Sequence, residues 1–350
     1  MMRHGLLVLI VGFTLLGARA RAETNGQQLA ESAGRPLVGT PAPRLTLKTI
    51  DGATIDLGQL YGKQAVYLKF WATWCVPCRQ QMPHFEKIYE AAGPDLAVIA
   101  INAGFNDSVD DIRAYQRKLG ITMPIVLDDG RLGAAFHLRV TPQHIVIGCD
   151  GRIQYIGHLA DSRLDAALLV ARTSSATDVQ TGTSRQTGTS SPGAPKGRHY
   201  DIGDRLPAQS VPLLDGTRVS LHDATDPRTT VLVFMSPWCE SYLATTRPAV
   251  SANCRHMREQ MGESADDQGA RWLGIASGLW ATRQDLHEYQ RKYHVRTPLT
   301  LDGSGALFHA FDVNEVPTAI ITDATGRILR RVQGNALDLP NALRSAIAGP

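Results

Sequence analysis

The sequence predicts an α/β protein of two similar domains, each with a mixed central sheet flanked by helices. The chain has 350 residues, of which 43% are apolar and 20% charged, which suffices for two ordinary cores. Two observations support this fold class. The same order of sequence signals occurs twice, and a polar segment rich in Ser, Thr and Gly (residues 173–198) separates the copies. Such a segment has few apolar groups to bury, so we expect a flexible linker.

The two copies match residue by residue at nearly constant spacing, which indicates a tandem duplication. The matched features are an Asp-Gly turn, a Trp-Cys pair, a Tyr-Gln-Arg-Lys run, a later proline and a Gly-Arg-Ile run. Their first or key residues are Asp51 and Asp215, Cys75 and Cys239, Tyr115 and Tyr289, Pro142 and Pro317, and Gly151 and Gly326. We therefore predict one domain at residues 36–172 and a second at 199–350.

Each copy is expected to run through the same elements. A short hairpin at the Asp-Gly turn comes first, followed by a buried strand, the Trp-Cys turn and an amphipathic helix. A strand, a second helix, a proline-led strand, a further strand and a closing helix complete the copy. The best-defined ranges are strands at 66–70, 96–102 and 145–147 with helix 107–119, and strands at 230–234, 272–276 and 318–322 with helix 282–293. Residues 23–35 are polar, and we expect them to be frayed.

The N-terminus has the pattern of a secretory signal peptide, which we place at residues 1–22. A basic start at Arg3 precedes an apolar run over 6–16, and Ala20-Arg21-Ala22 offers a cleavage site. An uncleaved anchor is the alternative, but the run is short for a transmembrane helix. Residues 1–22 contain three arginines and no acid, so their removal lowers the formal net charge from +3 to 0. The mature chain is therefore not expected to present the basic face that nucleic-acid binding needs. No later stretch approaches eighteen consecutive apolar residues, so we also expect no membrane insertion of the mature chain.

Cys75 and Cys78 stand two residues apart, after an apolar strand and before a helical pattern. A dithiol in this position can cycle between reduced and disulfide forms. At a helix N-terminus, free N–H groups and the helix dipole lower the pKa of Cys75, so we expect it to attack and Cys78 to resolve. Pro77 limits the conformations that the turn can adopt, and Trp74 should partly shield the dithiol. A structural disulfide or a zinc half-site is the alternative, although no second ligand pair for zinc is evident.

The run Trp71-Ala72-Thr73-Trp74-Cys75-Val76-Pro77-Cys78, with Val140-Thr141-Pro142 downstream, resembles the thioredoxin fold and, more narrowly, the TlpA/ResA branch of periplasmic thiol–disulfide oxidoreductases. The resemblance covers residues 36–172 and, more weakly, 199–350. It implies a cis bond between Thr141 and Pro142 beside the dithiol, with the backbone of Thr141 as a docking site for substrate. It also implies a redox-active Cys75–Cys78 disulfide, protein disulfide substrates, a periplasmic location and a reductant recharged by a membrane thiol donor.

Two residues near the motif bear on proton transfer. Members of the ResA branch often carry a glutamate three residues after the second cysteine, where this chain has Gln81, an amide that cannot take up a proton. Lys69, in the strand before the motif, could lower a thiol pKa as a cation, but we expect it to point to solvent. Acid–base assistance is therefore less well supported by the sequence than nucleophilic attack.

The second copy keeps one cysteine of the motif, because Cys239 matches Cys75 while Tyr242 stands at the position of Cys78. Three interpretations compete for this domain. It is a degenerate domain that binds clients as an adaptor or stabilises the protein, Cys239 acts alone in mixed disulfides or peroxide reduction, or Cys239 pairs with Cys254. A straight helix would hold Cys239 and Cys254 roughly 22 Å apart, so their pairing requires a break at Pro248. By resemblance, the Val316–Pro317 bond is cis.

The remaining candidates carry little chemistry. Cys149 lies on the order of 20 Å along its strand from Pro142, and we expect an incidental, partly exposed thiol, with intermolecular pairing as the alternative. Three histidines, His84, His137 and His158, lack metal-ligand spacing, so we predict no metal and no cofactor. The leading hypothesis is an enzyme, a thiol–disulfide oxidoreductase. The alternatives are a client-binding adaptor and a peroxide-reducing protein that uses Cys239.

Overall fold

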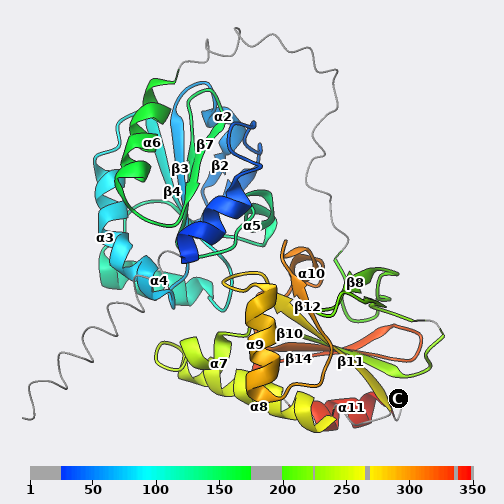
Figure 1. The fold of residues 1–350 in the computed structure, drawn as a ribbon. Coiled ribbons are helices and arrows are strands. Elements are labelled where there is room, and N and C mark those ends of the chain that lie inside the picture. The colour runs from blue at the N-terminus through cyan, green and yellow to red at the C-terminus, as the bar shows by residue number, and fades with distance from the viewer. Residues whose placement is uncertain (1–24, 175–198, 224, 265–268, 335–337, 348–350) are drawn as a thin grey trace, which may run out of the picture.

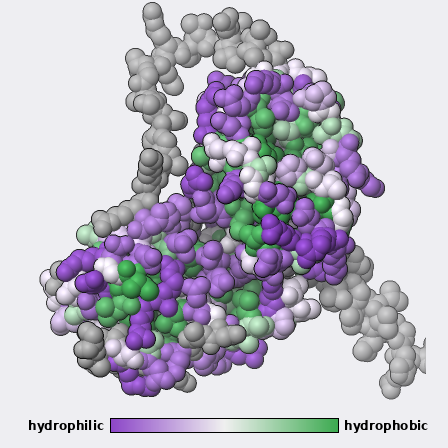
Figure 2. Space-filling view, turned by 180° about the vertical axis from the view of Figure 1, so that it is seen from behind, coloured by the Kyte–Doolittle hydropathy of each residue, from purple (hydrophilic) through white to green (hydrophobic). Residues whose placement is uncertain are grey.

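The computed structural model describes residues 25–174, 199–223, 225–264, 269–334 and 338–347. The predicted signal peptide and nearly all of the predicted linker lie outside these ranges. The described chain forms two lobes, each a separate domain, which meet along a narrow waist (Figures 1 and 2). Within the described ranges, no helix combines the length and apolar character needed to cross a membrane.

A five-stranded mixed sheet lies at the centre of the first domain, in the order β5-β4-β3-β6-β7. The first three strands in this order are parallel, and β6 and β7 are antiparallel to their neighbours. Their bounds are β3 (Ala65–Trp71), β4 (Leu96–Asn102), β5 (Ile125–Leu127), β6 (Gln143–Ile147) and β7 (Ile153–Gly157). Every residue of β3 is buried, as expected for a central strand with both faces covered.

Helices cover both faces of this sheet (Figure 1). On the face that carries Tyr67 and Trp71 lie α3 (Val76–Glu90), α4 (Val109–Leu119) and α6 (Ser162–Thr173). The face that carries Leu68 and Phe70 packs against α2 (Leu57–Leu60), α5 (Arg131–Ala135) and the hairpin of β1 (Thr46–Lys48) and β2 (Thr54–Asp56). The alternation of β3 side chains between the two faces thus produces two cores.

The second domain repeats this plan, with the sheet order β12-β11-β10-β13-β14. Its strands are β8 (Ser210–Pro212), β9 (Arg218–Ser220), β10 (Thr229–Met235), β11 (Ala270–Ser277), β12 (Leu299–Asp302), β13 (Thr318–Thr322) and β14 (Ile328–Gln333). Its helices are α7 (Cys239–Tyr242), α8 (Pro248–Ser264), α9 (Arg283–Tyr293), α10 (Ala306–Ala310) and α11 (Leu339–Ile347). The predicted fold class and duplication are therefore confirmed. The main difference is that the continuous α3 is replaced by the separate helices α7 and α8.

The expectation of a frayed N-terminal segment is wrong, because residues 25–34 form a helix. The side-chain oxygen of Gln27 accepts hydrogen bonds from the backbone N–H groups of His158 and Leu159, at 2.7 and 2.9 Å. Ala30 is fully buried. Tertiary contacts hold this helix, and a sequence pattern read locally does not reveal them.

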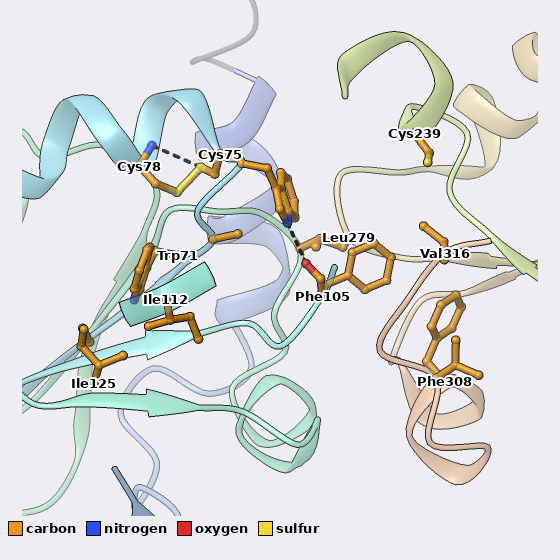
Figure 3. Close-up of a cluster of buried hydrophobic side chains, with 14 of the residues drawn as sticks. Trp71, Cys75, Cys78, Phe105, Ile112, Ile125, Cys239, Leu279, Phe308 and Val316 are labelled. Carbon is orange, nitrogen blue, oxygen red and sulfur yellow. Dashed lines mark hydrogen bonds between the residues drawn. A yellow bond between two sulfur atoms is a disulfide. The ribbon is translucent and has the colours of Figure 1, made fainter. Parts of the chain in front are cut away.

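Buried apolar side chains continue from the first domain into the second without interruption. Phe105, in the loop after β4, lies with its ring centroid 6.0 Å from those of both Trp238 and Phe308. In Figure 3, Phe105 lies between the Cys75–Cys78 pair on one side and Phe308 and Val316 on the other. The domains therefore share a packed apolar contact beside the dithiol.

Candidate active site

Cys75 and Cys78 form a disulfide at the start of α3, where the chain leaves β3 (Figure 3). Cys75 is the N-cap residue, and its sulfur accepts the backbone N–H of Cys78 at 3.2 Å. In the reduced protein this N–H would stabilise a thiolate on Cys75. Pro77 lies in the first turn, where a backbone N–H has no helical partner, so α3 tolerates it. The local geometry thus favours Cys75 as the attacking sulfur.

The peptide bond between Thr141 and Pro142 is cis, as the resemblance implied, and it lies immediately before β6. The carbonyl oxygen of Thr141 is 3.3 Å from the sulfur of Cys75. His158 approaches the carbonyl of Pro142 with Nδ1 at 2.7 Å, which fixes this segment from the other side. The structure therefore brings together four residues singled out in the sequence, namely Cys75, Cys78, Thr141 and Pro142.

Trp74 belongs to the same buried cluster as the dithiol, and only 2% of its own surface is exposed. Its indole N–H donates to the carbonyl of Phe105 at 2.7 Å. The ring also packs against two side chains of the second domain, Trp238 and Tyr242, with centroids 5.2 and 6.2 Å away. Part of the cover over Trp74 therefore comes from the second domain, and the sequence of the first repeat alone does not predict this contact.

The expectation that Lys69 points to solvent is wrong, because its side chain is fully buried. Lys69 lies between Tyr67 and Trp71 on the face of β3 that α3 covers. Its Nζ has no hydrogen-bond partner and lies 5.1 Å from the centre of the Phe85 ring. Burial lowers the pKa of Lys69 from 10.5 to about 7. A titratable amine therefore lies beneath the helix that carries the dithiol.

His144 is a site residue that the sequence reading missed. It lies opposite Lys69 in the antiparallel pairing of β3 with β6. Its Nε2 is 3.0 Å from the side-chain oxygen of Gln81, and its Nδ1 is 2.8 Å from the hydroxyl of Tyr67. Burial, followed by the charge of Lys69, lowers the pKa of His144 well below its ordinary value, so the imidazole is neutral. The position of His144, two residues after Pro142, could have signalled this contact, since alternate strand residues share a face.

In the second domain, Cys239 forms a disulfide with Cys254, one of the three interpretations left open by the sequence. The pairing is possible because α7 ends at Tyr242 and α8 begins at Pro248, so no straight helix separates the two sulfurs. Cys239 is fully buried. The Val316–Pro317 bond is cis, so this domain keeps the proline of the motif without the local dithiol.

The remaining predictions from the sequence concern Cys149, metal binding and Tyr242. Cys149 is a free, partly exposed cysteine, in agreement with the expectation for it. In the ranges that the structure describes, no cluster of three or more His, Cys, Asp or Glu side chains could hold a metal ion. Tyr242, at the position that matches Cys78, accepts the backbone N–H of Val76 from the first domain with its hydroxyl at 3.1 Å. This residue therefore links the two domains next to Cys75.

The mixed sheet, the Cys-X-X-Cys pair at the start of a helix and the neighbouring cis-proline define a thioredoxin-like protein. Comparison with family models gives the family. The AhpC/TSA family matches residues 38–156 and again residues 202–331, so the chain belongs to the AhpC/TSA family and contains two copies of its domain.

Individual relatives resemble one part of the chain each. The thioredoxin-like protein YneN of Bacillus subtilis is 31% identical over 169 residues, which are 47% of this chain and 93% of YneN. The thiol-disulfide oxidoreductase ResA of Halalkalibacterium halodurans is 36% identical over 117 residues, which are 33% of this chain and 65% of ResA. A crystal structure of a thiol:disulfide interchange protein from Chlorobium tepidum is 25% identical with a TM-score of 0.35, and the match covers 38% of this chain and 96% of that one.

Proposed function

We propose that this protein is a thiol–disulfide oxidoreductase that acts on disulfides of exported proteins through Cys75 and Cys78, in the direction of reduction. One observation carries the proposal. The sulfur of Cys75 lies at the start of α3, between the N–H of Cys78 and the carbonyl of Thr141, the residue that precedes the cis-proline. The names of the similar proteins YneN and ResA support the same chemistry.

The proposed reaction has two exchange steps. The thiolate of Cys75 attacks one sulfur of a client disulfide, forms a mixed disulfide and releases the other client sulfur as a thiolate. The thiolate of Cys78 then attacks the sulfur of Cys75, which forms the Cys75–Cys78 disulfide and releases the second client thiolate. The client gains two electrons and the protein loses two. The disulfide in this structure corresponds to the end of that cycle.

The roles of the supporting residues follow from their positions. The backbone of Thr141 would pair with an extended client segment, Pro142 would shape the groove, and Trp74 would line it. Pro77 would keep the first turn of α3 rigid, because its ring fixes one backbone angle. The hydrogen-bonded pair of Gln81 and His144 holds no carboxylate. The titratable group next to it is Lys69, opposite His144 in the sheet, with a pKa of about 7.

The proposal also includes where the protein works and what recharges it. We infer export to the periplasm by the signal peptide, and reduction of the dithiol by a membrane thiol donor. The direction of electron flow can be measured as a reduction potential. A value near or below about −250 mV fits a reductant, and one near about −120 mV fits an oxidant.

Trapping of mixed disulfides tests the function. A Cys78→Ser variant should accumulate covalent complexes with a disulfide-bonded protein such as insulin, because the resolving thiol is missing. A Cys75→Ser variant should form none, and Cys149→Ser is the matched control that should behave like the wild type. Complexes of equal yield through Cys75→Ser would contradict the assigned roles.

The peroxide-reducing alternative is less well supported. It requires a free Cys239 thiol, whereas this sulfur is buried and bonded to Cys254. The adaptor alternative assigns client binding to the second domain. The second domain lies over the dithiol of the first, and this position supports a different role.

A further inference from the structure

The second domain covers the dithiol face of the first. Cys75 has only 1% of its surface exposed, although a client disulfide must reach its sulfur. Trp238 and Tyr242 pack against Trp74, and the hydroxyl of Tyr242 accepts the N–H of Val76, the residue after Cys75. A protein client therefore has no path to Cys75 while the domains are arranged in this way.

The two domains contact each other through equivalent positions. The backbone N–H of Asn106 donates to the carbonyl of Asn314, and that of Trp280 donates to the carbonyl of Arg139, both at 2.7 Å. Asn106 corresponds to Trp280, after the second sheet strand of each repeat, and both adopt a φ of +54°. Arg139 and Asn314 each stand three residues before the cis-proline. The contact is thus a self-complementary one between two copies of the same face.

The segments next to each cis-proline take part in this contact. The indole N–H of Trp280 donates to the hydroxyl of Thr141 at 3.4 Å. In return, the backbone N–H of Val316 donates to the side-chain oxygen of Asn106 at 2.9 Å. The second domain thus occupies the part of the first that, under the proposed function, binds client backbone.

An acidic site beside the dithiol receives an arginine of the second domain. Asp107 is held by the N–H and hydroxyl of Thr73, at 2.8 and 2.6 Å, and by the amide of Asn102 at 2.8 Å. Its side chain is fully buried. The guanidinium of Arg247 lies 2.8 Å from Asp107 and 2.9 Å from Asp111. Because the first domain supplies Thr73 and Asn102 itself, the carboxylate of Asp107 is already in place for a basic partner.

The contact between the domains is not filled throughout. Towards α5 and α10 it leaves an open cavity of about 280 Å³. Residues of both domains line this cavity, among them Gly104, Leu127 and Asp129 from the first and Gly278, Phe308 and His309 from the second. Incomplete packing and many polar contacts are typical of interfaces that separate, unlike obligate ones.

We propose that the dithiol face is the client surface of the first domain, and that the second domain occupies it as an intramolecular competitor. Asp107 and Asp111 then bind a basic side chain of whichever partner is seated there, Arg247 in the closed form and a residue of the client in the open form. The inference rests on the proposed function. It adds that clients reach Cys75 only after the domains separate, and that clients with a basic residue near the disulfide are favoured.

The accessibility of Cys75 tests the competition without any client. The reduced full-length protein is exposed briefly to a maleimide, and the label on Cys75 is quantified by peptide mass spectrometry. Arg247→Gln should be labelled about tenfold faster than the wild type, because loss of one partner of a buried ion pair strongly weakens the contact. Arg255→Gln is the matched control, since Arg255 lies in α8, the helix that directly follows Arg247, and pairs with Glu240 of its own domain. Equal labelling of Arg247→Gln and wild type would overturn the competition.

Should Arg247→Gln fail to fold, as judged by circular dichroism, Trp280→Ala replaces it, because it removes the ring that covers Thr141 without changing any charge. Faster labelling again supports the competitor, and wild-type labelling overturns it. Maleimide requires only a free thiol. Fast labelling in a variant that reduces no protein disulfide would therefore refute the proposed function while the competition between domains stands.

Client charge is tested with two peptides that differ at one position, Arg or Glu, next to the same disulfide. Reduced Arg247→Gln protein should reduce the Arg peptide about tenfold faster than the Glu peptide, as expected for a charge-assisted contact with a buried carboxylate. Adding Asp107→Asn should remove most of this preference. Equal rates for the two peptides in Arg247→Gln would overturn the acidic site as a client subsite.

Discussion

Trp74 and Trp238 pack against each other with their ring centroids 5.2 Å apart and their planes tilted by 31°. They stand at matched positions of the two repeats, each directly before a cysteine. Each indole N–H donates to a backbone carbonyl of its own domain, Trp74 to Phe105 and Trp238 to Leu279, both at 2.7 Å. Because each domain fixes its own ring, the pair joins two preformed surfaces.

The first prediction concerns this pair of tryptophans. Trp238→Leu should loosen the closed arrangement, because offset aromatic pairs contribute about 0.5–1.5 kcal/mol beyond the area that they bury. The labelling rate of reduced Cys75 should then rise by roughly twofold to tenfold. Tyr293→Leu is a suitable control, since Tyr293 packs against Tyr289 within the second domain. An unchanged rate in a folded Trp238→Leu protein would contradict the role assigned to the pair.

Ionic strength should also open the protein. The side chains of Arg247 and Asp111 are 24% and 36% exposed, so salt can screen part of their attraction. The screening length falls from about 10 Å at 0.1 M to about 3 Å at 1 M salt. We expect the labelling rate of Cys75 to rise over this range in the wild type. In Arg247→Gln it should stay nearly constant, and a parallel rise in both proteins would show that the ion pairs do not hold the domains together.

Lys69 should make the stability of the first domain depend on pH. Its pKa is about 7 when folded and 10.5 ordinarily, so between these values the unfolded chain binds a proton that the folded chain does not. Stability therefore rises with pH across this window. Lys69→Met, which keeps an unbranched side chain of similar size, should be more stable at pH 7 by on the order of 3–5 kcal/mol, from the shift in pKa.

The measurement is denaturant unfolding of the oxidised protein at several values between pH 7 and 10. The advantage of Lys69→Met should shrink steadily as the pH rises. Lys63→Met is the matched control, since Lys63 is exposed and should show no such trend. A Lys69→Met protein that is less stable than the wild type at pH 7 would indicate that the buried amine has a stabilising partner.

The Cys239–Cys254 disulfide should act as a cross-link of the second domain. It closes a loop of 15 residues, and in the chain-entropy account such a loop contributes about 3 kcal/mol. A Cys239→Ala/Cys254→Ala protein should unfold in its second domain at lower denaturant concentration. Cys149→Ala, which removes the free cysteine, should leave this transition in place. An unchanged second-domain transition in the double variant would argue for a role other than cross-linking.

The sequence predicted the fold because its signals are local and repeated. The Trp-Cys turn, the matched prolines and the apolar strands fix the order of elements, and the Cys75–Cys78 site follows from two residues at a helix start. The break at Pro248 was the condition set for pairing Cys239 with Cys254, and the helices do separate there.

The remaining features depend on contacts between distant parts of the chain. Lys69 was expected in solvent, yet α3 covers it, because a strand residue can face either a helix or water with the same local pattern. The helix at residues 25–34 is held by His158 and Leu159, far along the chain. The ion pair of Arg247 with Asp107 joins two domains, and no spacing within either repeat signals it.

The central claim is that the protein exchanges disulfides through Cys75. The direct measurement is a single-turnover experiment, in which the fully reduced protein is mixed with a disulfide-bonded protein and the released client thiols are followed with time. We predict that Cys75→Ser lowers this rate to that of the uncatalysed mixture, while Cys149→Ser keeps the wild-type rate. A Cys75→Ser protein that still reduced the client at the wild-type rate would contradict the account.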